Sequence, residues 1–267
     1  MTENDLVNPF KSLNLYGLDN YFDELIKFYN LKKFPNVLQL DGKKGTGKFT
    51  LINHFLNYIF SGDDYDVSKK IINPSNTCYK QILDGIFENV VYIKNDGTSK
   101  VKIDDIRILK TLILKSTINN KPRFIIFDDI EKLSINTSNA LLKIIEEPSS
   151  NNYFILINNN QNNLIETISS RSLKIKIYLD ETSRLKIINS LILEHKIDPY
   201  LDYAKIKISP GEFLIYNKLC VDNSIDNDLP YISKIYKLLN LYKSNKNKLF
   251  INLSIFFTEI YFYQERV

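Results

Sequence analysis

Short apolar runs alternate along the chain with longer stretches in which apolar residues recur at helical spacing. Such runs are typical of strands buried in a parallel sheet, and the longer stretches are typical of amphipathic helices. The predicted strands are Val37–Leu40, Val90–Ile93, Arg123–Phe127, Tyr153–Ile157 and Leu173–Tyr178. The predicted helices are Asn14–Tyr29, Phe49–Phe60, Ile103–Ser116 and Thr137–Glu147. Repeated strand and helix units predict an α/β fold, with a parallel sheet flanked by helices.

The strand-like runs stop at Asp180, and the rest of the chain has helical patterns only. These cover Thr182–Glu194, Pro210–Leu219 and Leu229–Tyr261. We therefore expect three parts: an α/β domain over residues 1–179, a small helical domain over 180–222 and a short helical segment over 223–267.

Composition limits the classes of protein that fit. A chain of 267 residues with 44% hydrophobic residues can bury a sizeable core, which excludes a disordered protein. The net charge of +4 permits contact with nucleic acid without arguing for it. No apolar run approaches the roughly 20 residues that span a bilayer, and the start lacks a signal-peptide pattern, so we expect a cytoplasmic protein without membrane contact.

Cysteines and histidines give no sign of a metal site. Cys78 and Cys220 are the only cysteines, and neither has cysteine or histidine neighbours at metal-binding spacing. His54 and His195 lack partner acids at telling spacing and are expected to be structural or exposed. We therefore predict no zinc and no disulfide framework.

A phosphate-binding loop follows the first predicted strand. Gly42, Gly45, Gly47 and Lys48 match the pattern G-x-x-x-x-G-K and directly precede a predicted helix. Glycines let backbone N–H groups curl around phosphate oxygens, the helix N-terminus adds a positive dipole, and the lysine reaches the terminal phosphates. The segment predicts a P-loop nucleotide site.

The P-loop departs from the pattern where magnesium chemistry begins. Phe49 follows the lysine, whereas a working site needs Ser or Thr there to ligate the ion. Thr50 carries a hydroxyl one residue later, where it points elsewhere on the helix. We keep Thr50 as a candidate nucleotide-binding residue of a degenerate site.

Two acids end the third predicted strand in the form of a Walker B element. Asp128 would hold magnesium, directly or through water, and Asp129 stands where such ATPases usually carry a water-activating Glu. The Asp side chain is one methylene shorter, and a misplacement of about 1 Å costs about a hundredfold in rate.

The segment from Arg123 to Ile177 resembles the delta-prime subunits of bacterial DNA polymerase III clamp loaders, which are AAA+ proteins. The motifs that carry the resemblance are Asp128–Leu133, Ser138–Pro148, Phe154–Asn160 and Ser170–Ser172. Val101–Arg107 and Gly42–Thr50 also resemble segments of this family, so the resemblance covers residues 14 to about 220.

The resemblance implies a stator subunit in a ring of clamp-loader proteins, with a helical lid and a collar-like segment after the AAA+ domain. Arg171 would act in trans as an arginine finger at a neighbouring ATP site. Asn159 would be the sensor-1 residue, with Asn158 and Asn160 open as alternatives. The implied partners are the motor and delta subunits, the sliding clamp and, through the assembled complex, primer–template DNA. No cofactor is required, and ATP would bind without being hydrolysed if it binds at all.

Three further features depart from the family. The insert from Ser61 to Glu88 has only Cys78 where the family commonly has four zinc-binding cysteines. Glu212 stands where the resemblance implies a cationic sensor 2, and its charge would repel a γ-phosphate. The tail after Cys220 is short for a collar, and its apolar segment Leu249–Phe262 predicts a partner interface.

The sequence leaves other functions open. An active AAA+ ATPase, either the motor subunit or a remodelling enzyme, would need Thr50 or water to replace the missing magnesium ligand. A P-loop kinase would explain the loop but not the later motifs. A DNA-binding protein acting alone is disfavoured by the mild charge and the absence of a basic patch in the sequence. The departures at Phe49, Asp129 and Glu212 favour a subunit without hydrolysis.

Overall fold

The computed structural model describes residues 8–94, 101–115, 121–148, 151–160, 162 and 164–264. The chain divides into two compact units, Met1–Asp180 and Glu181–Val267. The further boundary expected near residue 222 stays a prediction.

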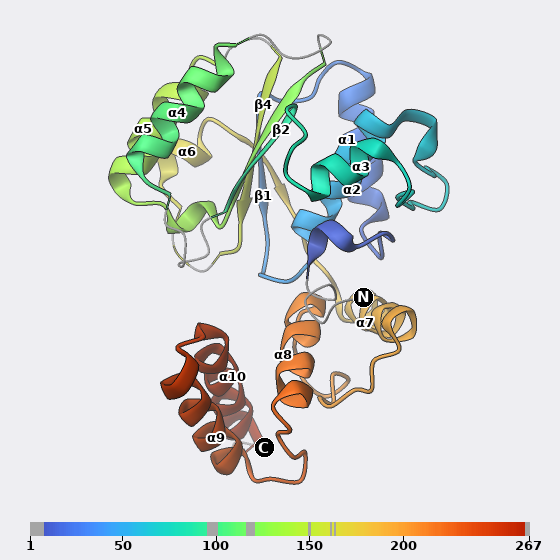
Figure 1. The fold of residues 1–267 in the computed structure, drawn as a ribbon, viewed down its shortest axis with the longest axis vertical. Coiled ribbons are helices and arrows are strands. Elements are labelled where there is room, and N and C mark those ends of the chain that lie inside the picture. Colours follow the sequence, from blue (N-terminus) through green and yellow to red (C-terminus); the bar gives the residue numbers. More distant parts are fainter. Residues whose placement is uncertain are drawn as a thin grey trace. The chain divides into compact units, whose positions relative to one another are not determined.

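Unit 1 is built on a five-stranded parallel sheet in the order β2-β3-β4-β1-β5 (Figure 1). The strands are β1 (Val37–Asp41), β2 (Val90–Lys94), β3 (Arg123–Asp128), β4 (Asn152–Asn158) and β5 (Leu173–Lys176). The predicted α/β class with a parallel sheet is therefore confirmed. Because all strands run the same way, their carboxyl ends meet at one edge of the sheet, which is where ligands bind in open α/β folds.

Helices cover both faces of the sheet (Figure 1). One face carries α1 (Asp19–Asn30), α2 (Lys48–Ser61) and α3 (Thr77–Leu83), and the other carries α4 (Ile103–Ile113), α5 (Ile135–Ile145) and α6 (Glu166–Ser169). The described part of unit 1 also has short 3-10 turns: η2 (Pro9–Lys11), η3 (Gly62–Asp64) and η5 (Ile130–Lys132). The sequence did not predict α3 or α6, because these helices have only seven and four residues.

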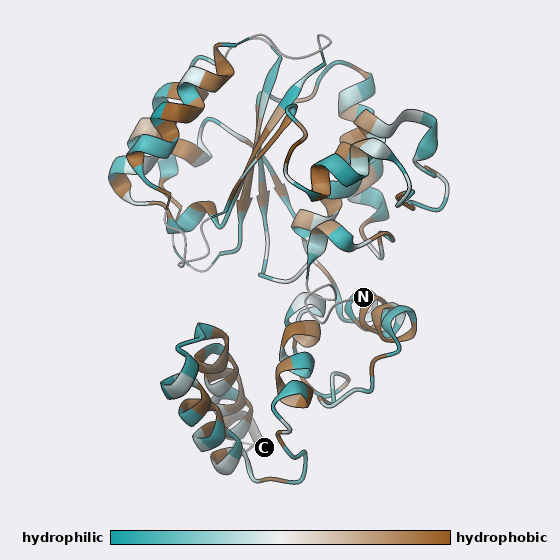
Figure 2. Ribbon diagram, in the orientation of Figure 1, coloured by the Kyte–Doolittle hydropathy of each residue, from teal (hydrophilic) through white to brown (hydrophobic). Residues whose placement is uncertain are grey.

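Alternation along each strand divides the apolar side chains between two cores. On β3, Phe124 and Ile126 pack with α1 to α3, whereas Ile125 and Phe127 pack with α4 and α5. Figure 2 shows the hydrophobic colour concentrated on these strands. The sheet is therefore buried on both faces, as expected for parallel strands between helices.

The first helix begins five residues later than predicted. Asn14 forms an antiparallel bridge with Ile71, and the backbone N–H of Leu15 donates to the carbonyl oxygen of Lys70 at 3.2 Å. The segment at Asn14 therefore pairs with the insert after α2 instead of forming a helix. Helix α1 begins only at Asp19.

Unit 2 is helical. It contains α7 (Glu181–His195), α8 (Pro210–Asp222), α9 (Tyr231–Asn245) and α10 (Lys248–Gln264). The predicted helical run Leu229–Tyr261 is broken into two helices at Lys246, whose backbone is left-handed with φ of 56°. One apolar cluster includes residues of all four helices, so the segments on either side of residue 222 share a core.

Much of the apolar face of α10 is covered within unit 2. Phe250, Leu253 and Phe257 are buried in its core, whereas Ile255 and Phe262 are 52% and 57% exposed. The sequence predicted an exposed apolar face on the segment Leu249–Phe262. In the structure, Ile255 and Phe262 are the large apolar side chains of this segment that remain exposed. In the described part of the chain, no helix is long and apolar enough to cross a bilayer.

Candidate functional site

The P-loop lies between β1 and α2, at the carboxyl edge of the sheet. Gly45 and Gly47 have φ of 78° and 86°, which side-chain-bearing residues rarely adopt. At Gly42 the reason is space, because a Cβ atom there would lie 2.6 Å from the carbonyl oxygen of Ile177. The glycines of the motif thus have structural causes in this chain, and Gly47 directly precedes the first residue of α2.

Lys48 is buried in the loop, 3% exposed. Its Nζ donates to the carbonyl oxygens of Gly42 and Lys43, both at 2.7 Å. Burial lowers the pKa of Lys48 to about 8, while nearby carboxylates oppose that shift. These carboxylates belong to Asp128, Glu131, Asp129 and Asp41. The lysine therefore occupies an acidic environment at the edge of the sheet.

Phe49 packs into an aromatic cluster where a magnesium-binding hydroxyl would be expected. Its ring lies 4.5 Å from Phe10 and 4.9 Å from Tyr92, measured between centroids, and both contacts are edge-to-face. Thr50 is half-buried on the next position of α2. The loss of the hydroxyl at Phe49 is thus matched by apolar packing around it.

Asp128 ends β3 beside this cluster. Its Oδ2 accepts a hydrogen bond from the Tyr92 hydroxyl at 3.0 Å, and its Oδ1 accepts one from the backbone N–H of Asp129 at 2.9 Å. Burial raises the pKa of Asp128, as does the neighbouring Asp129, and the hydrogen bonds oppose the shift. Tyr92 was not a candidate in the sequence, because nothing local shows that β2 is the neighbour of β3.

Asp129 is held in a left-handed conformation with φ of 55°. Lys132 Nζ lies 2.6 Å from its Oδ2, and the side-chain amide of Asn159 donates to its Oδ1 at 2.6 Å. Both carboxylate oxygens of Asp129 therefore have donors within unit 1. Lys132 was not a candidate site residue in the sequence analysis, although it stands only three residues after Asp129, in the 3-10 turn η5.

The three asparagines after β4 have different partners. Asn159 meets the acidic pair, and its backbone N–H also donates to both carboxylate oxygens of Glu131 at 3.2 Å. Asn158 instead donates its side-chain amide to Asp41 Oδ1 at 2.8 Å, and the N–H of Asn160 donates to Asn158 Oδ1. Of the three, Asn159 is the one whose side-chain amide lies within hydrogen-bond distance of both Asp128 and Asp129.

Arg171 lies in the turn between α6 and β5. Its NH1 donates to the carbonyl oxygen of Thr167 at 3.0 Å, and its NH2 forms an ion pair with Glu146 Oε1 at 2.9 Å. The arginine side chain remains 39% exposed and that of Glu146 remains 45% exposed. The guanidinium is therefore oriented by two neighbouring elements and still accessible from outside the unit.

A buried polar network joins this turn to the end of β1. Gln39 accepts a hydrogen bond from the Ser172 hydroxyl at 2.9 Å and donates to Asp41 Oδ1 at 2.7 Å. Asp41 also accepts from Asn158 and lies 3.8 Å from Lys174 Nζ. Gln39, a polar residue in the middle of the apolar strand β1, is the sequence feature that could have indicated this network. Its partners can be identified only from the sheet and its loops.

Comparison with known proteins places this chain in a family. The chain matches the family model "DNA polymerase III, delta subunit" over residues 17–180, more than half of its length.

The chain belongs to this family of DNA polymerase III clamp-loader subunits.

Individual relatives come from two kinds of subunit. The chain is 28% identical over 182 residues to a DNA polymerase III subunit gamma of Buchnera aphidicola from Acyrthosiphon pisum, covering 67% of this chain and 45% of that protein. It is 25% identical over 227 residues to a delta' subunit of Buchnera aphidicola from Schizaphis graminum, covering 84% and 63%. It is 24% identical over 171 residues to the delta' subunit of Bacillus subtilis strain 168, covering 63% and 49%. The chain thus spans less than two thirds of each of these relatives, and identity does not separate delta' from gamma.

In this clamp-loader subunit, Glu212 has a local structural role. Its Oε2 accepts from the Ser209 hydroxyl at 2.7 Å, and the Ser209 hydroxyl accepts from the backbone N–H of Glu212 at 3.3 Å. This capping box satisfies backbone donors at the start of α8. The acid that stands in the expected sensor-2 position therefore stabilises a helix of unit 2.

Cys78 donates its thiol to the carbonyl oxygen of Phe60 at 3.4 Å, and Cys220 is buried. Among the described residues, no group of three or more His, Cys, Asp or Glu side chains has the arrangement of a metal site.

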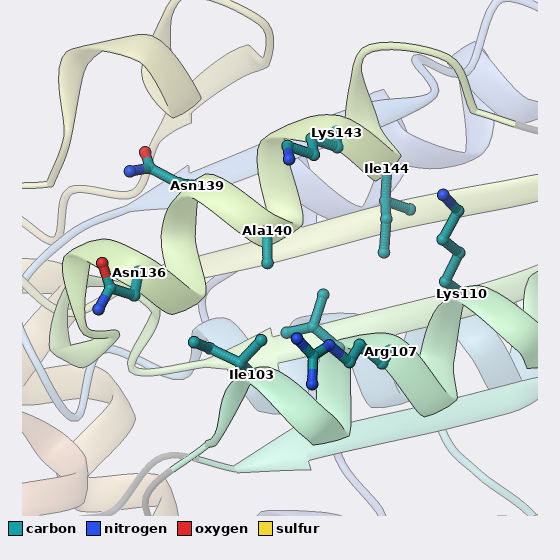
Figure 3. A pocket seen from close by; sticks show the side chains of 9 residues that line it. Ile103, Arg107, Lys110, Asn136, Asn139, Ala140, Lys143 and Ile144 are labelled. Atoms are coloured by element: carbon teal, nitrogen blue, oxygen red, sulfur yellow. The ribbon is translucent and has the colours of Figure 1, made fainter.

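A basic pocket of about 430 Å³ lies between α4 and α5. Ile106, Ala140 and Ile144 are among its apolar lining residues. Its cationic lining residues are Arg107, Lys110 and Lys143. Figure 3 shows these cations together with Asn136 and Asn139 along the two helices. The sequence did not reveal this patch, because Lys143 stands 36 residues after Arg107 and 33 after Lys110, and acids elsewhere balance these cations.

Proposed function

We propose that this chain is a delta-prime-like stator subunit of a clamp loader. In this role it supplies Arg171 to the ATP site of a neighbouring motor subunit and hydrolyses no ATP itself. Its partners are the motor and delta subunits of a hetero-oligomeric ring, the sliding clamp, and primer–template DNA bound by the assembled complex. Family membership supports a place in this complex, and the side chains of the site support the stator role.

The main observation for this proposal is that the P-loop lacks a hydroxyl ligand for magnesium. Phe49 offers no oxygen to a metal ion, and its ring packs on Tyr92, whose hydroxyl is bonded to Asp128. Magnesium in P-loop enzymes bridges the β- and γ-phosphates and neutralises the charge that develops during transfer. A site without that ion loses a main source of transition-state stabilisation, which favours a subunit that hydrolyses nothing.

The environment of Arg171 supports a role outside its own unit. The ion pair with Glu146 is partly exposed on both sides, and pairs of this kind contribute about 0–1 kcal/mol. Arg171 can therefore leave Glu146 and bind the oxygens of a γ-phosphoryl group with little loss of free energy. Arginine suits this task because its planar fork stays charged and binds phosphoryl oxygens through two donors.

The basic pocket between α4 and α5 supports contact with a polyanion in the assembly. Arg107 forms an ion pair with Asp104 at 2.8 Å on the surface of α4, and Lys110 lies one turn further on. Three cations at one groove attract phosphate groups through a salt-dependent electrostatic interaction. This is the part of the proposal that concerns primer–template DNA.

The alternative function is that of an active ATPase motor subunit. It is favoured by the gamma relative at 28% identity and by Lys48, which keeps the position of a phosphate-binding lysine. An assay of the isolated chain separates the two functions. The stator should hydrolyse no ATP above background, whereas a turnover of about 1 per second lies in the ordinary enzyme range and would identify a motor.

The decisive experiment measures clamp- and DNA-dependent ATP hydrolysis by the reconstituted complex with single variants of this chain. Arg171→Ala should lose the hydrolysis of the one site that it serves, because fingers of this kind contribute about a thousandfold or more. Lys48→Ala should change hydrolysis little, since the phosphates near Lys48 are not cleaved. Lys205→Ala, which removes a cation 85% exposed in unit 2, is the control for loss of a positive charge.

The two functions predict opposite results for the first two variants. Total hydrolysis falls only partly in Arg171→Ala, because other sites of the ring continue. If Lys48→Ala abolishes the contribution of this chain and Arg171→Ala behaves like Lys205→Ala, the stator assignment is wrong and the motor function replaces it.

A further inference from the structure

The P-loop site of this chain has two halves, and they differ in whether their residues can bind the corresponding part of a magnesium nucleotide. One half is the phosphate-binding loop itself, and the other is the place where a P-loop protein holds magnesium. That ion is bound by the Ser or Thr after the loop lysine and by the strand-end Asp, with oxygen ligands at about 2.0–2.1 Å.

The phosphate half fits its ligand. Gly45 and Gly47 have the positive φ that lets the loop curl, and α2 begins at Lys48, so its N-terminus directly follows the loop. Lys48 Nζ bonds to two carbonyl oxygens of the loop at 2.7 Å and to Thr46 Oγ1 at 3.5 Å. These partners are neutral, so phosphate oxygens would be stronger acceptors for the same ammonium group.

The metal half does not fit magnesium. Phe49 replaces the hydroxyl ligand, and its ring is in edge-to-face contact with Phe10 and Tyr92, which also contact each other at 5.2 Å. Asp128 Oδ2 accepts the Tyr92 hydroxyl at 3.0 Å. The two positions that would share one metal ion are therefore connected through the Tyr92 side chain instead.

The aromatic cluster of Phe10, Phe49 and Tyr92 is built into the fold from three separate segments. Phe10 belongs to η2, and its carbonyl oxygen accepts from the side-chain amide of Asn53 on α2 at 3.2 Å. Phe49 is the second residue of α2, and Tyr92 lies in the middle of β2. Moving Tyr92 away from Asp128 would therefore disturb packing between the sheet, α2 and the N-terminal turn.

We propose that this P-loop binds the phosphates of a nucleotide without a divalent cation, with the Tyr92 hydroxyl bonded to Asp128 in place of the metal. The inference deepens the proposed function and rests on it for a nucleotide site that does not hydrolyse. It concerns binding alone, so its test is independent of Arg171 and of the other subunits.

The experiment titrates the full chain with ATP that carries a fluorescent ribose label, once in excess magnesium and once in excess EDTA. Wild type should bind the label with the same Kd in both buffers. Lys48→Ala should weaken binding equally in both, which assigns the signal to the P-loop. Tyr58→Phe is the control for the Tyr92 substitutions below, because it removes a tyrosine hydroxyl on α2 that bonds to Asn30, away from the phosphate loop. It should bind the label as wild type does in both buffers.

A double variant tests the cause of the metal independence. Phe49→Thr with Tyr92→Phe supplies a hydroxyl ligand and frees Asp128 Oδ2, so binding should become about tenfold tighter or more in magnesium than in EDTA, equal to about 1.4 kcal/mol. If this variant does not fold, Tyr92→Phe alone keeps the ring and should show a smaller gain in the same direction.

Three results would overturn the proposal. Wild type binding that magnesium tightens about tenfold shows that a metal is held despite Tyr92. An absence of binding in both buffers shows that the phosphate half is not functional. A folded variant whose binding stays insensitive to magnesium shows that Phe49 and Tyr92 are not what excludes the ion.

Discussion

His54→Gln is expected to remove a large part of the pH dependence of stability in unit 1. The imidazole is fully buried, with Nε2 at 3.2 Å from the carbonyl oxygen of Ser12 and Nδ1 at 3.0 Å from the Tyr65 hydroxyl. A carbonyl oxygen only accepts, so Nε2 carries the proton and Nδ1 accepts from the tyrosine. The neutral ring thus satisfies both contacts, and a second proton would leave Nδ1 without an acceptor.

The magnitude follows from the pKa of this ring. Burial lowers the pKa of His54 from 6.5 to about 3, and the hydrogen bond to Ser12 opposes the shift. Below pH 6.5 the unfolded chain binds a proton that the folded chain does not bind until about pH 3. The contribution is therefore fully present above the unfolded pKa and is lost as pH falls toward the folded pKa. Between pH 7 and pH 5 the loss amounts to about 2 kcal/mol.

The assay is urea unfolding followed by circular dichroism at pH 7, 6 and 5. Wild type should lose about 2 kcal/mol more free energy of unfolding over this range than His54→Gln. Asp128 has a raised pKa and therefore a contribution of the opposite sign, but it is present in both proteins and cancels in the difference. Equal pH dependence in wild type and His54→Gln would refute the reasoning.

Three further substitutions test other parts of the structure. Gly42→Ala should lower the free energy of unfolding by about 1–3 kcal/mol, because its Cβ would approach the Ile177 carbonyl oxygen to 2.6 Å, and urea titration measures the loss. Ser172→Ala should cost about 1–3 kcal/mol in the same assay, since it removes the hydroxyl donor to the buried amide oxygen of Gln39. Lys143→Glu should weaken primer–template binding by the assembled complex and reduce its salt dependence by about one or two ions, measured by anisotropy at several salt concentrations. Unchanged values in any of these assays would contradict the corresponding contact or its proposed role.

Local sequence was sufficient for the elements that surround the site. Strand, loop and helix around Gly42 to Lys48 were predicted to within one residue of β1 and α2, because hydrophobic run, glycines and helical period all lie within the same segment. Phe49 was recognised as a departure for the same reason, since the expected hydroxyl has a defined place next to the lysine. Helix ends were less well predicted, as at Asn14, where a bridge to Ile71 competes with helix formation.

Only the tertiary structure decided which side chains meet. Tyr92 contacts Asp128 because β2 and β3 are neighbours with Lys94 paired to Asp128 in register, and Asn158 faces Asp41 because β4 lies beside β1. The amino-acid sequence by itself determined a degenerate P-loop on an α/β fold and a family resemblance that the comparison confirms at the level of clamp-loader subunits. It did not determine the aromatic cluster, the partner of Arg171 or the break at Lys246. Those depend on the order of strands and on packing between segments distant in the chain, whereas hydrophobic periodicity and turn residues act over a few neighbouring positions.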